Sequence, residues 1–449
     1  MNEQLITDYK TFLNNGKTER ECVEQIIKLA REKGYKDISE FQKLNPGDKV
    51  YITKMNKAIA LFEIGSECIE KGMNILGAHV DSPRLDVKQN PLYEKENISY
   101  LNTHYYGGIK KYQWTAIPLA IHGVVCKKDG SAIKVVIGEK DDDPVFCISD
   151  ILPHLASEQM KDKASDFIKG EDLDLIVGLG ISQENKNQNE QKKDETDKNK
   201  KEILALLEKT YNISENDFES AELEIVPAGK SKDMGLDCSM ILGYGQDDRS
   251  CAFASVKAML DSEKTKKTKC CLCVDKEEIG SVGATGMASN LFENMVAEII
   301  ERTQENYSEL TLRRCLSNCN MLSSDVNSAF DPINANLFDK DNSSTLGGGV
   351  AFQKYTGSRG KSGASDANPE FIAKIRAAME KANVKYQTAE LGKVDQGGGG
   401  TIAYHAARYG MNVLDAGIAV LSMHAPWEII SKEDISQLYK CYKAFFNIE

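Results

Sequence analysis

A short acidic stretch, Asp275-Lys276-Glu277-Glu278-Ile279-Gly280-Ser281, carries the residue types best suited to chemistry. It follows the apolar run 271–274, which favours β structure and predicts that the two glutamates stand at the end of a strand. Neighbouring side chains of a strand point to opposite faces, so at least one of the two carboxylates is expected to face inward. A buried carboxylate is costly without a partner. The pair therefore indicates a metal centre, with one glutamate binding the ion and the other moving protons beside it.

Other groups that bind metals stand at the ends of further predicted strands. His79 and His424 each follow an apolar run and precede turn-forming residues. Asp325 ends another such run, and Asp247-Asp248 opens a predicted helix. The carboxyl ends of the strands line the ligand site in open α/β sheets, which would bring these groups together. Two histidines and several carboxylates suit a pair of zinc ions that share one carboxylate.

Each of these residues also has a structural alternative. A histidine at a strand end is more often a hydrogen-bonded structural residue, and an aspartate before a helix is more often an N-cap. His79 and Asp81 carry a sharper signal, because residues i and i+2 of a strand share a face. Asp81 can then accept a hydrogen bond from the His79 ring and orient it for zinc. An Asx turn before Pro83 is the structural alternative for Asp81.

The composition is that of an acidic, soluble globular protein. A chain of 449 residues exceeds a typical single core, so two domains are expected. The net charge of −12 argues against nucleic acid or an anionic membrane as a partner, and no apolar run is long enough to span a membrane. Twelve cysteines scattered through the chain, with no signal peptide at the N-terminus, predict reduced thiols and a cytoplasmic protein.

The elements that must position these residues have an α/β order. A capping box at Thr18 begins a helix that ends at Gly34, and strands follow at 49–53, 58–62 and 73–79. After Leu236, helices and strands alternate in the order helix 250–260, strand 269–274, helix 284–302, strand 320–325, helix 369–382, strand 384–390, helix 401–408, strand 412–420 and helix 432–446. We predict one domain from residues 1–88 and 234–449, with a central mixed β-sheet flanked by helices on both faces.

The middle of the chain, residues 89–233, has a different pattern of predicted elements and is predicted to be an insertion. Residues 117–125 and 132–137 flank the turn sequence Lys127-Lys128-Asp129-Gly130, which predicts a β-hairpin. Residues 183–201 are almost entirely polar and indicate a solvated loop.

Four segments, taken together and in order, resemble the aspartyl aminopeptidase family of dizinc metallopeptidases, in a bacterial-type form. They are Gly77-Ala78-His79-Val80-Asp81-Ser82-Pro83-Arg84-Leu85, the acidic stretch 275–281, Ser323-Ser324-Asp325-Val326 and Ser422-Met423-His424. The resemblance spans nearly the whole chain. It implies a catalytic α/β domain that is interrupted by a β-rich oligomerisation domain. It also implies self-association through that inserted domain into a homo-oligomer, commonly a dodecamer.

The resemblance implies a set of metal ligands. His79 and Asp325 would bind one zinc ion, and Glu278 and His424 would bind the other. Asp247 would bridge the two ions. Asp248 is the alternative bridge, because this chain has Gln-Asp-Asp where the family usually has Leu-Asp-Asn. Co²⁺ or Mn²⁺ would fit the same kind of ligand.

The resemblance also implies catalytic roles. Glu277 would be the general base, and Asp81 would orient His79. His154, in the inserted domain, would reach the site of a neighbouring subunit and stabilise the tetrahedral intermediate. The implied protein is a cytoplasmic dizinc aminopeptidase that removes the N-terminal residue of peptides by attack of a metal-activated water. The alternatives are a dizinc amidohydrolase that cleaves N-acyl amino acids on a related scaffold, and a non-enzymatic oligomeric scaffold with a vestigial site.

Three more residues are candidates for substrate binding. Gly398 lies in the glycine run 397–400 before a predicted helix, where close backbone would suit a carbonyl or carboxylate, and a flexible turn is the alternative. Asp395 would meet the α-amino group of a peptide. Lys361 lies in segment 354–362, which departs from the aspartate-specific members of the family. A preference for an acidic N-terminal residue therefore does not carry over with the resemblance.

Overall fold

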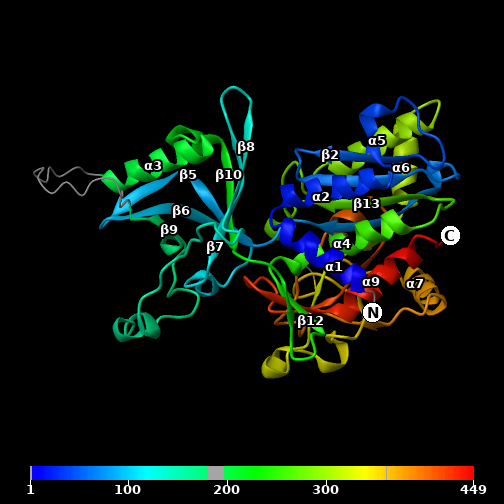
Figure 1. The fold of residues 1–449 in the computed structure, drawn as a ribbon. Coiled ribbons are helices and arrows are strands. Elements are labelled where there is room, and N and C mark those ends of the chain that lie inside the picture. The colour runs from blue at the N-terminus through cyan, green and yellow to red at the C-terminus, as the bar shows by residue number, and fades with distance from the viewer. Residues whose placement is uncertain (1–2, 180–196, 361, 449) are drawn as a thin grey trace, which may run out of the picture. The chain divides into compact units, whose positions relative to one another are not determined.

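The chain forms two compact units in a computed structural model that describes residues 3–179, 197–360 and 362–448 (Figure 1). The first unit comprises Met1–Ser82, Ser231–Met423 and Trp427–Glu449, and the second comprises Pro83–Lys230 and His424–Pro426. The boundaries predicted from the sequence were 88/89 and 233/234. Strand β5 (Arg84–Lys95) accounts for the difference at the first boundary, because it pairs from Arg84 onward with strand β6 of the second unit.

The first unit is built on a mixed sheet, which has nine strands in the described residues. Their spatial order is β1 (Lys36–Asp37), β2 (Lys49–Lys54), β3 (Ala58–Glu63), β13 (Thr268–Val274), β4 (Met73–His79), β14 (Asn320–Ser323), β18 (Asn412–Gly417), β16 (Val350–Gln353) and β17 (Tyr386–Thr388). Strands β13, β4, β14 and β18 run parallel, and β3 and β16 flank them in the antiparallel sense. The carboxyl ends of the four central strands therefore meet at one edge of the sheet.

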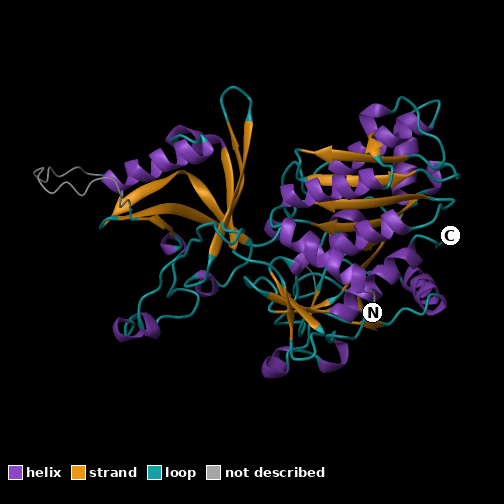
Figure 2. Ribbon diagram, viewed as in Figure 1, coloured by secondary structure: helices purple, strands orange, loops and turns teal. Residues whose placement is uncertain are grey.

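Helices cover both faces of this sheet, as predicted (Figure 2). One face carries α1 (Glu3–Asn15), α2 (Glu19–Glu32), α4 (Gln246–Asp261), α7 (Pro369–Lys381) and α9 (Lys432–Phe445), and the other carries α5 (Leu291–Thr303), α6 (Glu309–Ser317) and α8 (Ala403–Ala407). Strand β13 divides its side chains between the two cores: Cys271 and Cys273 pack on the first, and Cys270 and Leu272 pack on the second. The strand is apolar along its whole length because both of its faces are buried.

A ladder of asparagines holds three of the parallel strands in register. Asn74, Asn320 and Asn412 are paired across β4, β14 and β18. The Nδ2 of Asn412 donates to Asn320 at 3.1 Å, and that of Asn320 donates to Asn74 at 3.2 Å. Asn74 and Asn320 are buried, and amides that satisfy one another disfavour any slip of the strands. The register at this amino end determines which residues meet at the carboxyl end.

Two smaller sheets complete the fold. The first unit has a second sheet with the order β11 (Lys232–Met234), β12 (Met240–Gly243), β20 (Glu428–Ser431), β19 (Ala419–Leu421) and β15 (Asn327–Ser328). The second unit has an antiparallel sheet, β8 (Ala132–Ile137), β7 (Leu119–Cys126), β10 (Ala221–Pro227), β5, β6 (Ile98–Tyr106) and β9 (Leu175–Gly178), together with helix α3 (Lys198–Tyr211). The predicted hairpin is confirmed by the pairing of β7 with β8.

Local predictions have mixed outcomes. The capping box at Thr18 is present, and Gly34 follows the helix with a φ of +85°. The helix predicted over 284–302 begins only at Leu291, because the residues before it form turns in which Gly283 has a φ of +127°. In the polar stretch 183–201, residues 183–196 lie outside the described residues. The loop interpretation is wrong for the end of that stretch, where α3 begins at Lys198.

Two further expectations concern the redox state of the cysteines and the presence of a membrane-spanning helix. All twelve cysteines of the sequence are free thiols, and most of them are buried, as predicted for a reduced protein. Among the described residues, no helix combines the length and the apolar character needed to cross a membrane.

A buried carboxyl, Asp434, anchors the glycine run 347–349 to the start of α9. Its two oxygens accept hydrogen bonds from the backbone N–H groups of Gly347 and Gly349, each at 2.8 Å. Burial raises the pKa of Asp434 to about 6, although these hydrogen bonds act to lower it. The native protein therefore holds a proton on Asp434 at pH values where the unfolded chain has lost it.

This shift predicts how Asp434→Asn changes the pH dependence of stability. The contribution of a carboxyl with a raised pKa is fully present below the unfolded value and is lost as the pH rises through about 6. The free energy of unfolding of the wild type, minus that of Asp434→Asn, should fall between pH 4 and pH 6 by up to about 1.4 kcal/mol per pH unit. Urea denaturation of both metal-free proteins across that range measures it. If the free energies of unfolding of the two proteins changed in parallel with pH, the raised pKa of Asp434 would be contradicted.

Candidate metal centre

Three neighbouring strands and one helix bring the predicted ligands of the first unit together. His79 is the last residue of β4, and Asp325 follows the end of β14 by two residues. Glu277 and Glu278 follow β13, and the pair Asp247-Asp248 lies in the first turn of α4. Since β4 pairs with β13 on one side and with β14 on the other, these groups converge on His79.

The ring of His79 lies at the centre of a group of carboxylates. Its Nε2 is 3.3 Å from Asp247 Oδ1, 3.9 Å from Asp325 Oδ1 and 4.0 Å from Glu277 Oε2. His79 belongs to two sets of three residues, in each of which the ligand atoms lie within 4.8 Å of one another. One set is His79, Asp248 and Asp325, and the other is His79, Asp247 and Glu278. One imidazole with several carboxylates is a donor set that zinc accepts.

Asp81 is buried and contacts both sides of the site. His79 Nδ1 lies 3.1 Å from the backbone oxygen of Asp81 and 3.3 Å from its Oδ1, so Nδ1 carries the proton and Nε2 faces the carboxylates. The backbone N–H of Glu277 donates to Asp81 Oδ1, and that of Glu278 donates to Asp81 Oδ2, each at 3.2 Å. One carboxylate thus holds the imidazole and the two glutamates in a common arrangement. The contact expected from the i, i+2 spacing is present.

The predicted setting of the two glutamates is wrong. Strand β13 ends at Val274, and the pair lies in a 3₁₀ helix, Glu277–Ile279, rather than on a strand with side chains on opposite faces. Lys276, with a φ of +71°, turns the chain out of the strand. Both glutamates are half-buried, so neither is the fully buried carboxylate that the strand interpretation required. The turn allows two consecutive N–H groups to point at the same carboxylate.

The charge balance of the site favours a cation. Burial alone would lower the pKa of His79, but hydrogen bonds to Asp247 and Asp81 and the nearby Glu277 raise that pKa well above its usual value. Burial and then the charge of Asp248 raise the pKa of Asp325, and burial also raises the pKa of Asp248. These carboxylates disfavour one another's ionisation. A divalent cation would stabilise them in the ionised form, so the residues present fit a metal site.

The two adjacent aspartates make different contacts. A cis peptide bond joins Asp247 to Asp248. Asp247 directs Oδ1 to His79 Nε2, while its backbone oxygen accepts a hydrogen bond from Ser82 Oγ at 2.7 Å. Asp248 Oδ2 instead accepts the backbone N–H of His79 at 3.3 Å. Asp248 therefore already contacts the strand backbone, whereas Asp247 faces the ring nitrogen that would bind a metal.

Two predicted histidines belong to the second unit. His424 lies in the stretch His424–Pro426, where its Nδ1 donates to the carbonyl oxygen of Gly108 at 2.9 Å, so a metal would be held through Nε2. His154 lies in the 3₁₀ helix Pro153–Leu155 and is exposed. The roles of both residues stay predictions.

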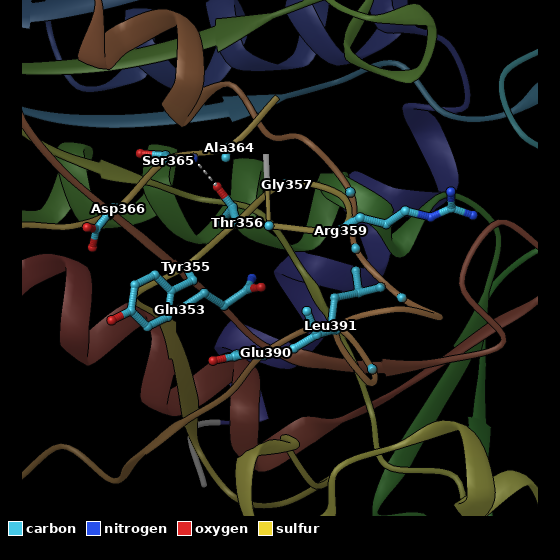
Figure 3. A pocket seen from close by; sticks show the side chains of 16 residues that line it. Gln353, Tyr355, Thr356, Gly357, Arg359, Ala364, Ser365, Asp366, Glu390 and Leu391 are labelled. Carbon is cyan, nitrogen blue, oxygen red and sulfur yellow. Dashed lines mark hydrogen bonds between the residues drawn. The ribbon is translucent and has the colours of Figure 1, made fainter. Parts of the chain in front are cut away.

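A cavity of about 550 Å³ lies beside the glycine run in the first unit (Figure 3). Its described lining comes from segments 353–366 and 390–399 and includes Gly398 but not Asp395. Gly357 donates its N–H to the oxygen of Gly399 at 2.8 Å, which joins the two segments. Figure 3 shows the guanidinium of Arg359 pointing away from Asp366. Lys361 lies outside the described residues.

Asp415, which was not among the residues predicted from the sequence, ties this glycine run to the sheet. Asp415 Oδ1 accepts hydrogen bonds from Thr401 Oγ1 at 2.7 Å and from Ser323 Oγ at 2.8 Å. Thr401 follows the glycine run directly, and Ser323 precedes Asp325 by two residues. The signal was available in the sequence, since an aspartate within the apolar run 413–416 requires buried hydrogen-bond donors.

Comparison with known proteins gives one consistent result. A family model described as Aminopeptidase I zinc metalloprotease (M18) matches residues 12–446. A curated relative from Clostridium acetobutylicum, described as a probable M18 family aminopeptidase 1, is 56% identical over 443 residues and is matched over 98% of this chain and 93% of its own length.

Solved structures agree with the match in sequence. The crystal structure of an M18 family aminopeptidase from Thermotoga maritima has a TM-score of 0.94 at 41% identity, covering 100% of this chain and 98% of that one. Aminopeptidase I from Clostridium acetobutylicum has a TM-score of 0.89 at 53% identity, covering 98% and 94%. The mApe1 dodecamer of S. cerevisiae shares the fold, with a TM-score of 0.77 at 20% identity over 99% and 96%.

The position of Asp81 predicts that Asp81→Asn weakens metal binding without unfolding the protein. The amide keeps the size of the side chain but loses the charge and one of the two acceptor oxygens. Zinc affinity, measured by competition with a chromophoric chelator, should fall about 10- to 100-fold. Asp237→Asn is the control, because that exposed aspartate also accepts two hydrogen bonds, both from Ser239. Equal zinc affinities in the two variants would contradict the role of Asp81.

Proposed function

Because the chain belongs to the M18 family of zinc aminopeptidases, we propose that the carboxylates around His79 form its catalytic centre and hold two zinc ions. Family membership sets aside the two alternatives, an N-acyl-amino-acid amidohydrolase and a non-enzymatic scaffold. The observation that carries the proposal is the position of His79 Nε2, which faces Asp247, Asp325 and Glu277 within 4.0 Å. One ion alone would leave part of this dense negative charge without a cation.

The proposed ligands divide into two sets with a shared carboxylate. His79 and Asp325 would hold one ion, Glu278 and His424 would hold the other, and Asp247 would be the ligand shared by both. Support for Asp247 over Asp248 comes from the hydrogen bond between Asp248 and the His79 backbone, which already uses Oδ2. The same oxygen and nitrogen donors accept Co²⁺ or Mn²⁺.

The mechanism that we propose assigns one task to each group of the chain. Bound zinc would lower the pKa of a water molecule and polarise the first peptide carbonyl. Glu277 accepts a proton from the attacking water and passes it to the leaving amine. Asp81 keeps the Nδ1 proton of His79 in place and fixes the backbone of Glu277. The Asp81 contacts therefore hold the base and the ligands at a constant separation during the proton transfers.

We propose that His154 acts in the site of a neighbouring subunit, where it donates a hydrogen bond to the oxyanion of the tetrahedral intermediate. Its surroundings support an interface with a second copy, because Leu155 is 68% exposed and Met160 is 76% exposed. Apolar side chains exposed to this degree beside one another favour burial against a partner. We therefore also propose that the protein self-associates through the second unit into a dodecamer, which is the assembly described for yeast mApe1.

The cavity beside the glycine run is the proposed site for the N-terminal end of the peptide substrate. Gly398 lines it, and the hydrogen bond from the N–H of Gly357 to the oxygen of Gly399 holds its two lining segments together. Asp395 is proposed to meet the α-amino group, and Lys361 is proposed to contact the substrate. The free thiols support a reducing compartment, and we propose that the enzyme works in the cytoplasm.

A pair of substitutions tests the division of labour between the two glutamates. Glu277→Gln should keep its zinc and lose about 10²- to 10⁴-fold in kcat, because the amide cannot carry the proton. Glu278→Gln should instead lose zinc from one of the two positions. Metal analysis of the purified variants, together with turnover of an amino-acid anilide, separates these outcomes. Near-normal turnover by Glu277→Gln would refute its role as the base.

His154→Phe tests the role of the second unit in catalysis. The variant should assemble like the wild type and show a lower kcat with little change in KM, because the missing hydrogen bond forms only as charge develops on the oxyanion. Light scattering and steady-state kinetics on one preparation measure both properties. His104→Phe, at another exposed histidine of the same unit, is the control. If His154→Phe only dissociates the oligomer, the residue is structural.

A further inference from the structure

Glu428 is a buried carboxylate that contacts the segment carrying Asp247. It is the first residue of β20, lies opposite Gly243 of β12 and is 1% exposed. Its Oε2 accepts two backbone hydrogen bonds, from Gln246 N–H at 2.7 Å and from Asp247 N–H at 3.1 Å. These N–H groups lie at the start of α4, before the non-helical backbone of Asp247 and Asp248, and have no preceding helical turn to supply acceptors. The negative charge is also favourable at the N-terminus of a helix.

The side chain of Gln246 strengthens this attachment. Its Nε2 donates to the backbone oxygen of Glu428 at 2.6 Å and to that of Ile241 at 3.2 Å. Its Oε1 accepts the hydroxyl of buried Tyr9 at 3.1 Å. Glu428 and Gln246 therefore bind each other through both side chain and backbone. Strand β20 is thus hydrogen-bonded to the start of α4 at Gln246 and at Asp247.

The backbone of Asp247 is held at both ends. Glu428 accepts its N–H, and Ser82 Oγ donates to its carbonyl oxygen at 2.7 Å. Ser82 comes three residues after His79, which is the residue that the Asp247 side chain faces at 3.3 Å. With both ends of the residue held, rotation of its side chain is what remains to move the carboxylate. Glu428 therefore fixes the backbone position from which the Asp247 carboxylate reaches His79.

We propose that Glu428 is a positioning residue for catalysis, which sets the placement of the Asp247 carboxylate between the two metal positions. This inference rests on the proposed function, in which Asp247 is the bridging ligand. Glu428 does not touch the substrate or the ions in this proposal. It acts through the backbone of Asp247, so its loss shifts both metal positions together rather than removing one ligand.

A purely structural role as a helix cap is the competing explanation, and the chain offers a matched comparison. Asp434 is also a buried carboxylate of the first unit that accepts two backbone N–H groups, those of Gly347 and Gly349. It holds a glycine run and no predicted ligand. If Glu428 only stabilises the fold, substitutions at the two positions should have the same kinds of effect.

The experiment compares Glu428→Gln, Glu428→Ala and Asp434→Asn as full-length zinc-loaded proteins. Zinc affinity is measured by competition with a chelator. The values of kcat and KM are measured with an amino-acid anilide, and Tm is measured by calorimetry. Glu428→Ala should bind zinc about 10- to 100-fold more weakly and lose kcat to a similar extent, since partners that orient ligands have effects of this size. Glu428→Gln, which keeps one carbonyl acceptor, should recover part of both losses. Asp434→Asn should lower Tm alone.

Two outcomes would overturn the inference. Glu428→Ala with wild-type zinc affinity and kcat, and with a lower Tm, would make Glu428 a structural cap. Loss of zinc by Asp434→Asn to the same extent would attribute the effect to general destabilisation. A wild-type protein that binds no zinc or does not cleave the anilide would instead refute the proposed function. The inference about Glu428 is tested separately from the proposed function, because the Glu428 variants are compared with a wild type that binds zinc and is active.

Discussion

The chain must keep several carboxylates close to one imidazole, in a part of the sheet where most of them are buried. Such a cluster repels itself, and the raised pKa values of Asp248 and Asp325 express that repulsion. Backbone N–H groups of the fold hold several of these carboxylates. Asp81 accepts two of them from Glu277 and Glu278, and Asp248 accepts that of His79. Neutral donors hold the carboxylates in place without neutralising the charge that attracts a cation.

The geometry of a parallel sheet supplies the convergence. His79, the acidic stretch and Asp325 are far apart in the sequence, but β13, β4 and β14 are adjacent and parallel. Their carboxyl ends therefore lie at one edge. The asparagine ladder holds the register at the opposite end, and both faces of the sheet are covered by apolar cores. A rigid support of this kind is what a site with tolerances of about half an ångström requires.

Much of this arrangement could be predicted from the sequence, because it depends on local patterns. The apolar runs identify β4, β13 and β14, and the residues that follow or end them include candidate ligands. Contacts between distant segments escaped prediction. Residues 276–278 were predicted to end a strand. The turn that they form is held by Asp81, which lies about two hundred residues earlier and could not be recognised as a contact from the sequence. Glu428 was missed for the same reason, since its hydrogen-bond partner Gln246 is distant in the sequence. His154 received a role only through resemblance, because its surroundings in one chain are exposed.

The correction at Glu277 and Glu278 changes the physical basis of their different roles. On a strand, the two side chains would differ because they pointed to opposite faces. In the 3₁₀ helix their backbone N–H groups are instead held side by side, each bound to one oxygen of Asp81. Asp81 also contacts the ring of His79, so this one carboxylate joins the proposed base to two proposed ligands. A reaction that needs a proton carrier at a constant distance from its ligands benefits from such a shared anchor.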